Sequence, residues 1–137
     1  TLNSYGSEDI SHITSNFKNR FLKLPYGAIP KMLEVIHFND SKPENKNIVL
    51  PNKNENMVKI FVDNKWVYKD KNEAILDMVD KKYMLMDAQY ELLNIKDNDD
   101  SYVEKTYTKF KKYYEDGDKE LVDRLKKECE MVLLNNR

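Results

Sequence analysis

The stretch that decides the fold is VKIFVDNKWVY, Val58–Tyr68, near the middle of the chain. Valine and isoleucine at positions 58, 60 and 62 alternate with other residues, which is the two-residue period of a β-strand with one buried face. Asp63 and Asn64 follow at once, and both tolerate the positive φ that a two-residue hairpin turn requires. A second β-prone run, from Lys65 to Tyr68, comes next. The stretch therefore predicts a small antiparallel β-hairpin.

Helical patterns occupy the chain on both sides of this hairpin. Before it, apolar residues spaced by three or four predict helices over residues 14–24 and 29–38. After it, capping boxes at residues 70–73 and 101–104 open two more helices, of which the first could break at the polar cluster of residues 80–82. An acidic linker is expected at 94–100, and a last helix from 118 to 135. The pattern predicts a mostly helical α+β fold, with about five or six helices around one small antiparallel β-hairpin.

Composition limits the classes of protein to consider. A chain of 137 residues with 40% hydrophobic and 11% aromatic residues suits one domain with a packed core. We expect residues 1–8 to be a polar lead-in from a missing N-terminal part, and residues 9–137 to form a single globular domain. No apolar run approaches the roughly 18 residues of a membrane span, so no membrane contact is expected. Cys129 is the one cysteine, and neither a metal site nor a cofactor is predicted.

The most chemically suggestive segment is the loop HFNDSKPENKNI, at residues 37–48. A histidine followed by an asparagine-rich loop is similar to the HNH nucleases, in which the histidine activates water beside a metal. The catalytic candidates on that hypothesis are His37, Asn39, Glu44 and Asn47. Two features count against it, because the predicted helix ends at His37 where HNH nucleases have a strand before the histidine, and because the only other histidine, His12, lies far upstream. We therefore favour a structural loop whose amides bond to nearby backbone.

A second functional hypothesis concerns nucleic acid. Two helices followed by a lysine-bearing hairpin are similar to a winged-helix domain, in which one helix enters the major groove and the hairpin follows the phosphates. The candidate nucleic-acid-binding residues are Lys31, Lys59, Lys65, Trp66 and Lys69. Carboxylates are interleaved with these lysines, and the formal net charge of the whole chain is −1. An ordinary solvated surface is therefore the simpler interpretation.

Four segments of the sequence resemble a known family. They are NSYGSEDISHIT at residues 3–14, PYGAIPKMLEVIHFNDSKPENKNI at 25–48, DNKWVYKDKNEAILDMVDKKY at 63–83 and MVLLNNR at 131–137. Together they resemble the C-terminal domain of largely uncharacterised proteins of giant DNA viruses, which often carry an N-terminal C2H2-type zinc finger. The matching positions are His37, Phe38, Asn39, Pro43, Glu44, Asn45, Asn47, Ile48 and Trp66. The resemblance implies a nucleic-acid-associated viral protein inside the infected host cell, in the cytoplasm or the viral factory. It implies no catalytic residues.

These observations favour a non-enzymatic module that binds a protein partner or associates with itself. The near-neutral charge, the tyrosine-rich helices and the lack of a catalytic constellation support that function over the other two. Direct binding of DNA or RNA and an HNH-like nuclease centred on His37 remain the alternatives.

Overall fold

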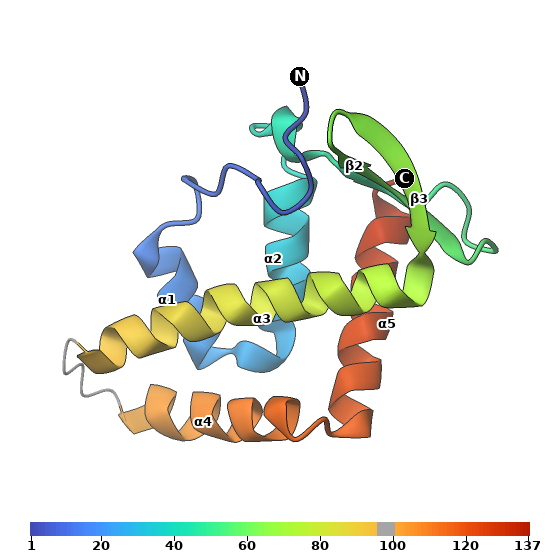
Figure 1. Ribbon diagram of the computed structural model, residues 1–137. Helices are drawn as coiled ribbons and strands as arrows, with labels where there is room; N and C mark the ends of the chain where they lie inside the picture. Colours follow the sequence, from blue (N-terminus) through green and yellow to red (C-terminus); the bar gives the residue numbers. More distant parts are fainter. Residues whose placement is uncertain (96–100) are drawn as a thin grey trace.

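The computed structural model describes residues 1–95 and 101–137, and it confirms the predicted mostly helical α+β fold (Figure 1). Of the linker expected at 94–100, residues 96–100 lie outside the described part of the chain. The elements in chain order are α1 (Ser15–Lys23), η1 (Pro25–Gly27), α2 (Ala28–His37), η2 (Pro43–Asn45), β1 (Ile48–Val49), β2 (Met57–Val62), β3 (Lys65–Asp70), α3 (Lys71–Ile95), α4 (Ser101–Glu115) and α5 (Lys119–Asn135).

Local signals set most of these boundaries. The Thr14 side chain accepts a hydrogen bond from the Phe17 backbone at the start of α1, and Asp118 does the same for Leu121 at the start of α5. Asp63 and Asn64 adopt φ values of 52° and 64°, as a two-residue turn between β2 and β3 requires. The hairpin therefore forms where the alternation and the turn predict it.

Two details differ from the expectation. The run after the polar loop adds β1 to the sheet, because Ile48 pairs with Ile60 and extends the hairpin to three antiparallel strands in the order β1-β2-β3. The polar cluster at residues 80–82 does not break α3, which continues to Ile95. The helix can continue because the Lys82 side chain is buried and its ammonium donates a hydrogen bond to His37 Nε2.

The helices form the hydrophobic core together with the face of the sheet that carries Val58 and Ile60. Figure 1 shows α3 crossing in front of α2 and α5, with α4 running antiparallel beneath it. Aromatic rings fill the space between α3 and α4, with the centroids of Tyr90 and Tyr107 4.7 Å apart and those of Tyr83 and Tyr114 4.2 Å apart. Cys129 is buried in α5, and burial raises the pKa of its thiol to about 12, so that it stays protonated.

The N-terminal residues belong to the same folded unit. The Asn3 backbone N–H donates to the Glu44 carbonyl, and the Tyr5 N–H donates to the Phe61 carbonyl of β2. Residues 3–9 therefore lie against the sheet and the loop before it, across the boundary expected at residue 8. The sequence around residues 3–9 does not predict these contacts, because the hydrogen-bond partners lie more than 30 residues away.

None of the helices in the described part of the chain is long and apolar enough to span a membrane.

Candidate functional site

The predicted catalytic residue His37 lies at the end of α2 with its side chain fully buried. Its Nδ1 is 2.9 Å from Asn47 Oδ1, and its Nε2 is 2.8 Å from the Lys82 Nζ. Because a lysine ammonium can only donate, Nε2 accepts and the ring proton lies on Nδ1, which donates it to Asn47. Both ring nitrogens are therefore occupied within the protein.

Burial also fixes the charges of this pair. It lowers the pKa of His37 to about 3, with a further contribution from the positive charge of Lys82. The same burial lowers the pKa of Lys82 to about 8. Near neutral pH the imidazole is uncharged and the lysine is mostly protonated, which is the arrangement that their hydrogen bond needs.

Two asparagines of the loop tie this pair to the N-terminal segment. Asn47 Nδ2 donates to Glu8 Oε2 at 2.7 Å and to the Asn3 carbonyl at 3.1 Å. Asn45 is also fully buried; its Oδ1 accepts from Asn3 and from the Asp9 backbone, and its Nδ2 donates to the Asp9 carbonyl at 2.7 Å. These two amides thus hold residues 3–9 in place, and those partners lie more than 30 residues away instead of in the nearby backbone that the sequence predicted.

The other two catalytic candidates lie apart from the ring. The Asn39 side chain accepts a hydrogen bond from the Ser41 N–H, an ordinary Asx turn. Glu44 contributes its backbone carbonyl to Asn3, and its Oε1 is buried with no partner. Across residues 1–95 and 101–137, no cluster of His, Cys, Asp and Glu has the makings of a metal site. This geometry gives the nuclease hypothesis no support, because the His37 ring is fully buried and its two nitrogens are hydrogen-bonded to Asn47 and Lys82.

Sequence reasoning missed Lys82 and Glu8 as members of this network. A signal for Lys82 was available, since it lies three residues after the buried Val79 and four before the buried Met86, on the apolar face of α3. No comparable pattern marks Glu8.

The hairpin presents a second candidate site on its outward side. The register places Phe61 opposite Trp66 and Lys59 opposite Tyr68, and paired residues share one face of a sheet. The residues of this face are Val49, Met57, Lys59, Phe61, Trp66, Tyr68 and Asp70, and we call it the open face. The opposite face carries the buried Val58 and Ile60, which turn toward the helices.

Aromatic rings and one lysine dominate the open face. Trp66 is 39% and Tyr68 59% exposed, although large apolar side chains usually pack inside. The Lys59 Nζ lies 5.9 Å from the centroid of each of these two rings. Phe61 packs edge-on against Trp66 at 5.4 Å. The Lys59 ammonium therefore lies close to two aromatic rings that are partly exposed to solvent.

The charges around this face favour an anionic ligand. Within the described chain, no carboxylate forms an ion pair with Lys59, the one lysine of this face. Asp70 is the one carboxylate on the open face, and its Oδ2 is engaged by the Glu73 N–H at the start of α3. Lys59 is therefore the one cation that the open face offers to a ligand.

The structure separates the other nucleic-acid candidates from Lys59 and Trp66. Lys65 and Lys69 alternate with Trp66 along β3, so they lie on the opposite side of the sheet, and Lys69 lines a hollow with Glu73 and Asp77 of α3. Lys31 lies in the first turn of α2 and pairs with Glu34 at 3.3 Å. Six of the ten residues of α2 are buried, so this helix is not presented to a groove of DNA.

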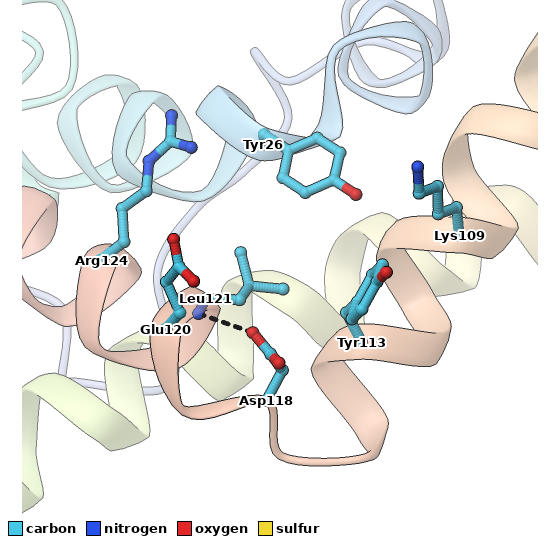
Figure 2. Close-up of a pocket in the computed structure, with 7 residues that line it drawn as sticks. All are labelled: Tyr26, Lys109, Tyr113, Asp118, Glu120, Leu121 and Arg124. Carbon is cyan, nitrogen blue, oxygen red and sulfur yellow. Dashed lines mark hydrogen bonds between the residues drawn. The ribbon is translucent and has the colours of Figure 1, made fainter.

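A shallow cavity of about 350 Å³ opens between η1, α4 and α5 (Figure 2). Its walls carry both signs of charge, with Lys109 and Arg124 against Asp118 and Glu120. Figure 2 shows the Asp118 carboxylate engaged with the Leu121 N–H as the cap of α5. This balance gives the cavity no preference for an anion or a cation.

Comparisons of the chain with protein-family models, with curated proteins and with solved structures found no match. The candidate sites therefore rest on their geometry.

Proposed function

We propose that this chain is a non-enzymatic binding module of a nucleic-acid-associated viral protein, and that it contacts nucleic acid itself through the open face. The observation that carries the proposal is Lys59, whose ammonium pairs with none of the described carboxylates and lies 5.9 Å from the centroids of two exposed aromatic rings. Phosphates pair with lysine, and bases offer flat surfaces to aromatic rings. The family resemblance agrees with this function and would place it in the infected cell, beside a zinc-finger region.

The mode of binding differs from a winged helix. In that arrangement a helix reads the major groove, whereas here α2 is part of the core. The sheet would act alone, with Lys59 as the cation of its open face. Such a surface neutralises few phosphates, so the binding should be weak and should depend on base contacts as well as on charge.

Fluorescence anisotropy with labelled DNA and RNA over a salt series tests the proposal. With about one phosphate neutralised by Lys59, the logarithm of the affinity for a single strand should fall with the logarithm of the salt concentration with a shallow slope of about −0.7. Lys59→Ala should weaken binding and flatten that slope. Lys109→Ala is the control, because Lys109 is a lysine on α4, and α4 lies away from the sheet in Figure 1. Dissociation constants above about 10⁻⁴ M at low salt, or equal losses in both variants, would contradict it.

A second candidate is the function that the sequence favoured, self-association or binding of a protein partner. The observation in its favour is the outer edge of β3, which pairs with β2 alone among the described strands. Two such edges could join two sheets. Light scattering after size exclusion over a range of concentrations tests it, and a monomer at every concentration would exclude self-association.

A further inference from the structure

We infer that the ligand of the open face is a single strand, whose bases stack on Trp66 and Tyr68 while Lys59 contacts the phosphate that links them. This inference rests on the proposed function and names the form of nucleic acid that the same face would take.

The spacing of the rings fits separated bases. Trp66 and Tyr68 are two residues apart on β3, so their Cα atoms are about 6.7 Å apart. Stacked bases follow one another at about 3.4 Å along each strand. The two rings can therefore hold one unstacked base each, or a single base between them. A duplex has its base faces stacked on one another and offers neither arrangement.

The position of Lys59 fits the phosphate between two such bases. It lies on β2 directly across from Tyr68 and diagonally from Trp66, and its Nζ is equally far from both rings. Its side chain is half-buried, so the cation is already held in place before a ligand arrives. A flexible surface lysine would lose more conformational entropy on binding.

A protein partner fits this face less well. An apolar partner that covered Trp66, Tyr68 and Phe61 would also cover the Lys59 charge, and burying an unpaired charge is costly. A nucleic-acid strand brings one phosphate for every base. The aromatic surface and the cation are then used together.

The chain carries a built-in probe, because Trp66 is its only tryptophan. We would titrate the protein with a twelve-nucleotide oligothymidine, with an abasic strand of the same length and with a duplex, and record tryptophan emission. The abasic strand has the same phosphates and no bases. Oligothymidine should quench Trp66 in a saturable manner, and the abasic strand and the duplex should each bind at least tenfold more weakly.

Substitutions complete the experiment, with anisotropy of the labelled strand as the readout. Trp66→Ala should weaken binding roughly tenfold, since a stacked base contributes on that order, and Trp66→Phe should recover most of it. Tyr113→Ala is the matched control, because Tyr113 is an exposed tyrosine on α4 and should leave affinity unchanged. Unfolding curves of each variant verify that the fold is retained.

The outcomes separate this inference from the proposed function. If oligothymidine and the abasic strand bind equally and Trp66 emission is unchanged, stacking is refuted while nucleic-acid binding stands. Equal affinity for the duplex also refutes it. If no nucleic acid binds at low salt, both fail.

Discussion

Replacing Asn47 by alanine should cost far more stability than the same change at Asn39 in the same loop. The Asn47 side chain makes three hydrogen bonds, to His37, to the Asn3 carbonyl and to the Glu8 carboxylate. A neutral hydrogen bond contributes about 1 kcal/mol net and one to a charged group about 2 kcal/mol, so Asn47→Ala should lower the free energy of unfolding by about 4 kcal/mol. Asn39 makes one exposed bond, to the Ser41 N–H, and its loss should cost about 1 kcal/mol.

Urea denaturation followed by circular dichroism measures the difference. With a slope near 2 kcal/mol per molar urea, the midpoint should move by about 2 M for Asn47→Ala and by about 0.5 M for Asn39→Ala. Loss of Asn47 should also free residues 3–9, which would show as faster amide exchange at Tyr5, whose N–H bonds to β2. If the two variants are equally stable, the buried network does not hold the loop and its structural role must be abandoned.

Three other results are expected. Because burial lowers the pKa of His37 from its usual 6.5 to about 3, the unfolded chain binds a proton between these values that the folded chain does not. The free energy of unfolding should therefore fall by about 2 kcal/mol between pH 7 and pH 5, and His37→Gln should remove that part of the pH dependence. Phe110→Ala, in the fully buried core, should cost about 3–5 kcal/mol, whereas Leu24→Ala, at a side chain 70% exposed, should change thermal stability little. Plasmid incubated with the protein and Mg²⁺ or Mn²⁺ should stay intact, and cleavage by the wild type that His37→Gln abolishes would restore the nuclease hypothesis.

The network around His37 illustrates how a charged side chain can be buried at moderate cost. Lys82 gains an acceptor in His37 Nε2, and the ring gains partners on both nitrogens. Removing one member leaves its partners buried without a hydrogen bond. The free energy of unfolding then falls by more than the intact hydrogen bond contributed to it. We expect substitutions at Lys82, His37 and Asn47 to be coupled, so that a double variant loses less stability than the two single variants together.

The sequence by itself determined the secondary-structure elements that depend on neighbouring residues. The hairpin follows from strand alternation around Asp63 and Asn64, and α1 and α5 begin where Thr14 and Asp118 can cap them. Alternation also determined which hairpin residues share a face, although not which face meets solvent. That depended on α3 and Tyr5, which lie against the side of Ile60 and Val62.

Only the tertiary structure decided the roles of the polar residues. The polar cluster that contains Lys82 predicted a break in the helix, because a charged side chain on a buried face needs a hydrogen-bond acceptor. That acceptor is His37, which lies 45 residues away in the sequence. Residues 1–8 looked like a lead-in because the amides that bind them follow α2, more than 30 residues later. A polar side chain carries no sign of a distant partner in its own neighbourhood, so its burial becomes visible only when the chain has folded.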